Sequence, residues 1–311
     1  MTAASHPPTA PLSSAWSALP PEYAIPDHAP SQAEAREYCR RLARSHYENF
    51  SVASWFLPER LRQHFFNVYA YCRISDDLGD EVGDTAASLQ LLDQWETELT
   101  ACYDGHPRHP VLVALSETVR KFEIPKHEFA DLLTAFRQDQ NITRYETFDE
   151  LLGYCRYSAN PVGHLVLYLC GYSDSDRQQL SDYTCTALQL ANFWQDVSAD
   201  FAKGRIYLPL EDLRRFDVSE EVIRHGKNRS AFCAMMEFEV ERAREWFAQG
   251  MPLIAKVDRA LATDIELFSR GGQEILDAIE RQHYAVLGRR PAISKTRKLA
   301  LVARAALGKL R

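Results

Sequence analysis

Two segments far apart in the chain repeat acidic side chains at an interval of four residues. The first carries Asp76 and Asp80, and the second carries Asp196 and Asp200, with Asn192 four residues earlier. Because successive residues of an α-helix are rotated by about 100°, each set falls on one helical stripe. Like charges at this spacing repel each other, so a helix gains nothing from them unless a cation lies nearby. Both segments are therefore predicted to be helices with a functional polar face.

Further side chains extend the two stripes. Tyr69 and Arg73 share the polar face of the first segment, and Gln189 shares that of the second. On the opposite side of the second segment lie apolar residues such as Trp194 and Phe201, which predicts a helix buried on most sides. Its acidic stripe would then face a cavity, where carboxylates must be paired or bind a metal.

The side-chain donors on the two stripes select the metal. They are oxygens, with no His or Cys, which favours Mg²⁺ over zinc or copper. Mg²⁺ is usually held by a few carboxylates together with phosphate oxygens, so the stripes predict a phosphorylated substrate. A di-iron bundle requires two Glu-x-x-His motifs, and the chain has one, from Glu280 to His283. No P-loop, dinucleotide fingerprint or nucleophile elbow points to a nucleotide enzyme or a hydrolase.

Helix-type patterning covers most of the 311 residues and strand signals are scarce, which predicts an all-α single domain. Asp174 is predicted to cap the helix that carries the second stripe, and Gly204 with Pro209 to end it. Helices are predicted at 32–48, 59–80, 86–103, 109–122, 126–138, 147–156, 161–170, 175–202, 217–225, 229–255 and 257–285.

The predicted domain organisation has three parts: a Pro-rich mobile arm at 1–31, a catalytic domain at 32–288 and a basic tail at 289–311. The tail holds eight Lys or Arg and no acid, although the whole chain carries a net charge of −7. Two interpretations of the tail stay open, a solvated terminal helix or a basic amphipathic helix on an anionic membrane surface. Nucleic acid is not expected as a partner, because the acidic remainder has no basic stripe interleaved with aromatic residues.

Cysteine usage and hydropathy bear on the compartment. The seven cysteines form no Cys-x-x-Cys pair and fit a reducing environment. No run of 18 apolar residues and no secretory signal is present. A cytoplasmic location is expected, at the inner membrane surface if the tail binds there.

Taken together, these motifs resemble the squalene/phytoene synthase family over about residues 35–285. The likeness extends beyond the aspartate segments to Phe50–Pro58, Tyr154–Cys155, Val162–Gly163 and Gly204–Tyr207. The resemblance implies a class I isoprenoid synthase fold, a helical bundle around a central apolar cavity. Within the family, the segments beginning at Asn49, Ser158 and Asn192 are most similar to the bacterial hydroxysqualene synthases of the hopanoid pathway.

This resemblance implies a carbon–oxygen lyase that removes diphosphate from presqualene diphosphate and adds water. It also implies Mg²⁺ as cofactor and other enzymes of squalene and hopanoid synthesis as partners. The implied metal-binding and catalytic residues are Asp76, Asp80, Asn192, Asp196 and Asp200. The implied substrate-binding residues are Tyr69, Arg73, Asp77, Arg137, Gln189, Phe193, Lys203, Arg205 and Tyr207. Aromatic faces from Phe193, Phe136 or Tyr168 would stabilise the carbocation.

Three positions depart from the pattern of phytoene and dehydrosqualene synthases, which join two prenyl diphosphates. Gln195 stands where an Arg usually precedes the motif aspartate, Arg137 stands where Tyr is common, and Tyr47 replaces a small Ser. Loss of the motif Arg lowers the positive charge, which is tolerable if no second diphosphate has to be bound. Two alternatives stay open: a head-to-head prenyl synthase making presqualene diphosphate, squalene with NADPH, or a phytoene-type product, and a noncatalytic isoprenoid-binding helical scaffold.

Overall fold

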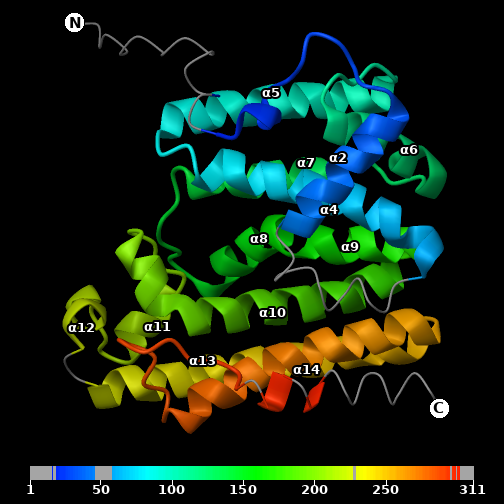
Figure 1. The fold of residues 1–311 in the computed structure, drawn as a ribbon. Helices are drawn as coiled ribbons and strands as arrows, with labels where there is room; N and C mark the ends of the chain where they lie inside the picture. The colour runs from blue at the N-terminus through cyan, green and yellow to red at the C-terminus, as the bar shows by residue number, and fades with distance from the viewer. Residues whose placement is uncertain are drawn as a thin grey trace, which may run out of the picture. The chain divides into compact units, whose positions relative to one another are not determined.

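The structure, a computed structural model, describes residues 16, 19–45, 58–226, 229–294, 296–298 and 300–301. These residues form helices joined by turns and contain no strand, which confirms the predicted all-α fold (Figure 1). The chain divides into two compact units. One comprises Met1–Tyr47 and Gln63–Asn141, and the other comprises Glu48–Arg62 and Ile142–Arg311. The two aspartate stripes therefore belong to different units.

The described residues of the first unit form five α-helices and the short 3₁₀ helix η2. These are η2 (Pro21–Tyr23), α2 (Gln32–Ser45), most of α4 (Glu59–Asp80), α5 (Thr85–Asp104), α6 (Pro110–Phe122) and α7 (His127–Asp139). At its core, the fully buried ring of Tyr71 on α4 lies 5.8 Å from Trp95 on α5 and 5.0 Å from Phe129 on α7. Its hydroxyl donates to the Phe129 carbonyl at 3.0 Å. These contacts hold α4 against α5 and α7.

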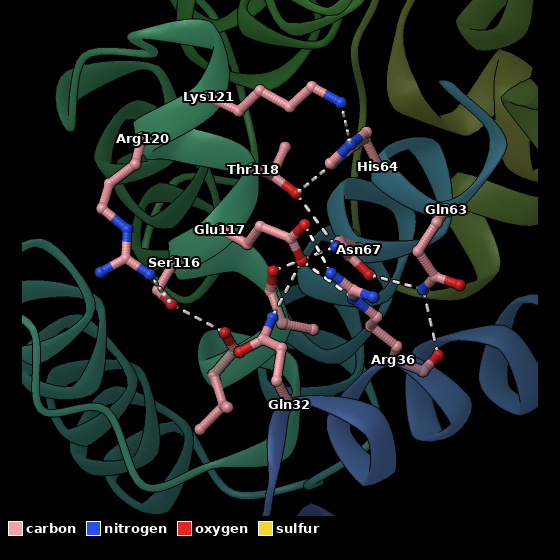
Figure 2. A network of polar contacts seen from close by, with 12 residues as sticks. Gln32, Arg36, Gln63, His64, Asn67, Ser116, Glu117, Thr118, Arg120 and Lys121 are labelled. Carbon is pink, nitrogen blue, oxygen red and sulfur yellow. Dashed lines mark hydrogen bonds and ion pairs between the residues drawn. The ribbon is translucent and has the colours of Figure 1, made fainter. Parts of the chain in front are cut away.

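A polar network fixes α4 against α6 (Figure 2). The Asn67 amide donates to the Ala114 carbonyl and the Thr118 hydroxyl, each at 3.0 Å. Lys121 Nζ lies 3.1 Å from His64 Nε2, and His64 Nδ1 lies 3.0 Å from the Thr118 hydroxyl. Because an ammonium group only donates, His64 accepts at Nε2 and donates from Nδ1. Burial and the Lys121 charge lower the pKa of His64 accordingly. The network sets the rotation of α4 about its axis, and with it the direction of the first stripe.

The second unit is built around one long helix. Its elements are α8 (Phe148–Ser158), α9 (Asn160–Leu169), α10 (Ser175–Ala202), α11 (Leu210–Arg215), α12 (Glu220–His225), α13 (Arg229–Gly250), η3 (Met251–Lys256) and α14 (Arg259–Arg281). In Figure 1, α10 lies between the α8–α9 pair and the α13–α14 pair, and it packs against all four. A glycine permits the close approach of α14: a Cβ on Gly272 would lie 2.4 Å from Phe247 Cζ and 2.8 Å from Leu188 Cδ2.

The predicted helices at 59–80 and 175–202, which carry the two stripes, are confirmed at both ends. Asp174 caps α10 as predicted, by accepting a hydrogen bond from the Arg177 amide. The helix predicted at 229–255 ends instead at Gly250, because Pro252 opens η3. The end of the helix predicted at 32–48 lies outside the described residues. Among the described helices, none is both long and apolar enough to cross a membrane.

Candidate active site

The first stripe occupies the last turns of α4 in the first unit. Arg73 lies between two carboxylates: its Nε donates to Asp77 Oδ2 at 3.0 Å, its Nη2 donates to Asp77 Oδ1, and its Nη1 lies 3.4 Å from Asp76 Oδ2. Burial raises the pKa of Asp76 to about 6; Arg73 opposes this shift, and Asp80 adds to it. Asp76 and Asp77 thus share the guanidinium of Arg73, and the charge of Asp80 makes ionisation of Asp76 harder.

Two other predicted substrate-binding residues lie in the same unit. Tyr69 is half-buried on α4, and burial raises the pKa of its phenol, which keeps the hydroxyl protonated at neutral pH. Arg137 on α7 pairs with two acids of α5, since its Nη2 lies 2.8 Å from both Asp93 Oδ1 and Glu96 Oε2. The structure therefore joins Arg137 to α5, and its predicted contact with substrate stays a prediction.

The second stripe lies on α10 in the second unit. Asn192 is exposed, whereas Asp196 and Asp200 are partly buried, and Gln189 extends the same face. The opposite face is buried: Trp194 is fully covered. The helix is therefore amphipathic in the predicted sense, with its acids on one side and its apolar residues in the core.

The carboxylate of Asp196 already has a cationic partner within the second unit. Arg290 donates from Nε to Asp196 Oδ1 and from Nη2 to Asp196 Oδ2, the latter at 2.9 Å. The same Nη2 lies 3.1 Å from Gln195 Oε1. Gln195, which is 7% exposed, donates from Nε2 to the Pro291 carbonyl at 2.6 Å. Residues 286–294, called the C-terminal strap below, are thus held on α10 at Gln195 and Asp196.

The end of α10 holds Arg205 close to the second stripe. Gly204 has a φ of +82°, and its amide donates to the Phe201 carbonyl at 3.0 Å. The Arg205 amide donates to the Asp200 carbonyl at 2.9 Å, which completes a Schellman motif. Arg144 adds a bond of 2.7 Å to the Gly204 carbonyl. The backbone of Arg205 is therefore tied to that of a predicted metal ligand.

Phe193 and Tyr207, both predicted to bind substrate, stack on each other with ring centroids 3.9 Å apart and planes 10° apart. Tyr145 and Tyr154 pack around Tyr207 at 5.9 and 5.8 Å. The space beside the stacked pair has a volume of about 10 Å³, which is the size of one water molecule. In this structure the four rings anchor the loop after α10, and a direct role in binding stays a prediction.

An apolar groove with a volume of about 390 Å³ opens beside the second stripe. We call it the α14 groove. Two residues of the aspartate segment, Asn192 and Gln195, lie on its wall. The rest of the lining consists of Leu188, Ala191, Leu267, Phe268, Gly271, Gly272, Ile275, Ile293, Lys298 and Leu301. One cavity thus joins a predicted metal ligand to a largely hydrocarbon wall.

The donor chemistry of the stripes fits Mg²⁺. Each stripe presents carboxylate oxygens, and Asn192 adds an amide oxygen. Within the described part of the chain, no three His, Cys, Asp or Glu side chains are close enough to form a protein-only metal cage. Mg²⁺ does not need such a cage, because one or two carboxylates usually hold it together with substrate phosphate oxygens. The Arg290 guanidinium on Asp196 shows that this carboxylate accepts a cation.

Sequence reasoning missed two residues that contact the aspartate segments. Arg290 is bound to Asp196, and the Tyr23 hydroxyl donates to Asp77 Oδ2 at 2.7 Å. Tyr23 comes from the segment predicted to be part of a mobile arm, yet it is buried in the first unit. The one sequence signal for the burial of Tyr23 was that an aromatic residue stands in a Pro-rich segment. Tyr47 and the segment from Asn49 to Leu57, which contributed to the family resemblance, lie outside the described residues.

Comparison with known proteins assigns the family. Residues 43–297 match the squalene/phytoene synthase family. The phytoene synthase of Arthrospira platensis is 31% identical over 282 residues, which cover 86% of this chain and 91% of that protein. The crystal structure of squalene synthase HpnC from Alicyclobacillus acidocaldarius is 43% identical, covers 87% of this chain and 98% of its own, and has a TM-score of 0.78. A dehydrosqualene synthase in complex with ligand is 28% identical, with coverage of 89% and 96% and a TM-score of 0.79. The chain therefore belongs to the squalene/phytoene synthase family.

Proposed function

We propose that this protein ionises presqualene diphosphate and that water captures the resulting cation, giving hydroxysqualene and diphosphate. The family acts on prenyl diphosphates and generally depends on divalent metal ions. The observation that carries the proposal is the α14 groove, whose largely apolar wall includes Asn192 and Gln195 of the second stripe. A prenyl diphosphate has the same division into a hydrocarbon chain and a charged head group.

The proposed metal ligands are Asp76, Asp80, Asn192, Asp196 and Asp200. Mg²⁺ bound by these groups would neutralise the leaving diphosphate as its C–O bond breaks. Arg73 and Arg205 would add guanidinium groups, which bind phosphate oxygens with two hydrogen bonds at once. Tyr69, Gln189 and Lys203 would supply further hydrogen-bond donors to phosphate oxygens.

The proposed reaction balances without a reductant. The electron pair of the C–O bond leaves with diphosphate, and a cyclopropylcarbinyl cation remains on the hydrocarbon. After rearrangement, the oxygen of one water bonds to the cation, and the proton that this water loses passes to the released diphosphate. The apolar side chains of the α14 groove would shield the cation from bulk water, and the ring of Phe268 on its wall could stabilise positive charge.

Two observations favour a squalene-type reaction over phytoene synthesis. The chain is 43% identical to squalene synthase HpnC and 31% identical to the phytoene synthase of Arthrospira platensis. Gln195 is neutral where condensing enzymes usually carry Arg, and its two side-chain hydrogen bonds hold the C-terminal strap. Condensation of two prenyl diphosphates is the second candidate, because phytoene synthases are among the relatives.

Product analysis by mass spectrometry tests the proposal. The purified protein and Mg²⁺ are incubated separately with presqualene diphosphate and with farnesyl diphosphate, each with and without NADPH. We expect hydroxysqualene from presqualene diphosphate alone, with no need for NADPH. Squalene formed only with NADPH, or a product from farnesyl diphosphate, would contradict the proposal in favour of another family reaction. If neither substrate releases diphosphate, the result would support the alternative of a noncatalytic isoprenoid-binding scaffold.

Gln195→Arg tests whether this position helps to choose the substrate. The variant places a second guanidinium beside Arg290 and removes the acceptor of the Arg290 Nη2 hydrogen bond, because a guanidinium only donates. We expect turnover of farnesyl diphosphate relative to presqualene diphosphate to rise. Gln195→Ala is the matched control, because it removes the same acceptor without adding charge. An unchanged substrate ratio in Gln195→Arg would count against a role for this residue in substrate choice.

A further inference from the structure

Tyr23 is a buried residue outside the family-matched region that contacts the first aspartate segment. It is 2% exposed, and its hydroxyl donates to Asp77 Oδ2 at 2.7 Å. Burial, followed by the hydrogen bond to Asp77, raises the pKa of Tyr23, which favours the protonated, donating form of the hydroxyl. The interaction is therefore a fixed link between η2 and α4.

Asp77 passes this link on to Arg73. The Asp77 side chain is 6% exposed, and both of its oxygens are used: Oδ2 accepts from Tyr23 and from Arg73 Nε, and Oδ1 accepts from Arg73 Nη2. A bidentate pair of this kind fixes the plane of the guanidinium. Arg73 Nη1 is then directed to Asp76, at 3.4 Å. These contacts favour a supporting role for Asp77, behind Arg73, over direct contact with substrate.

The position of Tyr23 is itself well defined. Its amide donates to the Pro20 carbonyl at 2.9 Å within the short η2 turn, and the fixed φ angles of Pro20 and Pro21 restrict the approach of the chain. One residue earlier, the Glu22 carbonyl accepts from the Tyr38 hydroxyl at 2.8 Å. The η2 segment thus takes part in two tyrosine hydroxyl bonds: Tyr38 on α2 donates to its backbone, whereas Tyr23 donates from it to Asp77.

We propose that Tyr23 is a positioning residue that acts through Asp77 to hold the Arg73 guanidinium in the orientation that binds diphosphate. The inference rests on the proposed function in one respect, the assignment of Arg73 as a diphosphate-binding group. Without the Tyr23 hydroxyl, the Asp77 carboxylate loses one of its donors and can rotate. The guanidinium then gains alternative orientations, and binding of an anion has to select among them.

The test uses Tyr23→Phe in the full-length protein, with inorganic pyrophosphate and Mg²⁺ as the probe in isothermal titration calorimetry. We expect pyrophosphate affinity to fall by about three- to tenfold. This is the effect expected when one hydrogen bond in a network of charged groups is lost. Tyr38→Phe is the matched control, since it removes a hydroxyl that bonds to the same segment at Glu22 and has no bond to Asp77. Equal losses in the two variants, or no loss in Tyr23→Phe, would overturn the proposal.

A double-mutant cycle separates positioning from a general structural effect. In an Arg73→Ala background, Tyr23→Phe should have no further effect on pyrophosphate affinity, because the group through which it acts is gone. An additive loss would show that Tyr23 acts by another route and would refute the inference. If Tyr23→Phe fails to fold, Asp77→Asn replaces it in the same cycle, with the same expected coupling to Arg73.

Arg73→Ala and Tyr23→Phe separate the role of Arg73 from that of Tyr23. If Arg73→Ala alone leaves pyrophosphate affinity unchanged, the assignment of Arg73 is wrong, and the positioning role of Tyr23 falls with it. If Arg73→Ala weakens binding while Tyr23→Phe does not, the proposed function stands and the role of Tyr23 is refuted.

Discussion

Arg290 and Asp196, which are 94 residues apart in sequence, form an ion pair through two nitrogens of one guanidinium. The arginine side chain is 59% exposed and the aspartate side chain 16% exposed. A cation bound by Asp196 must therefore compete with a guanidinium that is already in place. A stronger ion pair therefore means a lower apparent affinity of the second stripe for metal.

Arg290→Ala should tighten metal binding. A half-exposed ion pair is worth up to about 1 kcal/mol, so its removal should lower the half-saturating metal concentration by up to about fivefold. Mn²⁺ is used as the probe because it shares the oxygen-ligand preference of Mg²⁺. The concentration of unbound Mn²⁺ is measured by electron paramagnetic resonance. Arg289→Ala, at the exposed neighbouring position, is the control. Equal Mn²⁺ affinity in both variants and the parent protein would contradict the competition.

Asp76→Asn and Asp196→Asn should each lower turnover by about two orders of magnitude or more, because each removes a negative charge from a proposed metal ligand. Diphosphate release is the measurement, and chelation of Mg²⁺ by EDTA should abolish it reversibly. Asp182→Asn, on the same helix as Asp196, is the control. Its carboxylate pairs with His164 at 2.7 Å and belongs to neither stripe. Retained activity in the first two variants would refute the ligand assignment.

Two adjacent glycines on α14 should respond in opposite ways to alanine. At Gly272 the new methyl group would lie 2.4 Å from the buried ring of Phe247, so Gly272→Ala should lower the free energy of unfolding by about 1–3 kcal/mol. At Gly271 nothing lies within 4 Å, and the better helix propensity of alanine should leave stability unchanged or raise it by up to about 1 kcal/mol. Urea denaturation of both variants measures the difference. Similar losses of stability would mean that close packing of α14 does not depend on Gly272.

Glu239 should make stability fall as pH rises. Burial raises the pKa of Glu239 from an ordinary value of 4.5 to about 8; Arg242 opposes the shift, and Asp212 adds to it. Between these values the folded protein keeps a proton that the unfolded chain has released. The contribution of protonated Glu239 to the free energy of unfolding is therefore complete below about pH 4.5. It declines by about 1.4 kcal/mol per pH unit until about pH 8.

Glu239→Gln removes this titration while keeping the shape of the side chain. The stability of the variant relative to the parent should therefore rise from pH 5 to pH 8, as measured by urea denaturation at each pH. Glu237→Gln, at an exposed position on the same helix, is the control and should show no such trend. A constant difference between Glu239→Gln and the parent would show that Glu239 is ionised in the folded protein throughout.

The sequence was sufficient where the signal is local. The helical patterns of α4 and α10, together with the end signals of α10, located both helices at their observed ends, and the stop at Gly204 is seen as a Schellman motif. It was insufficient for α11, because six residues are too few to show a period. The break at Gly250 was missed although Pro252 was visible, since the apolar pattern continues through it.

The contacts of the candidate site depended on information that no local pattern contains. Arg290 and Gln195 are 95 residues apart, and Tyr23 and Asp77 are 54 residues apart. Neither pair follows from spacing, because only the packing of the helices brings them together. The residue types at the stripes could be predicted, whereas the partners that orient or neutralise them could not.

The buried position of Tyr23 bears on how this protein should be shortened for laboratory work. The family-matched stretch begins at residue 43, so a chain trimmed to residues 43–297 would keep the acids of both stripes and Arg290 but lose Tyr23. Asp77 would then have Arg73 as its partner without the phenol, and the surface beneath η2 would be uncovered. Such a fragment would resemble the full-length protein in every family feature and still differ from it beside the first stripe.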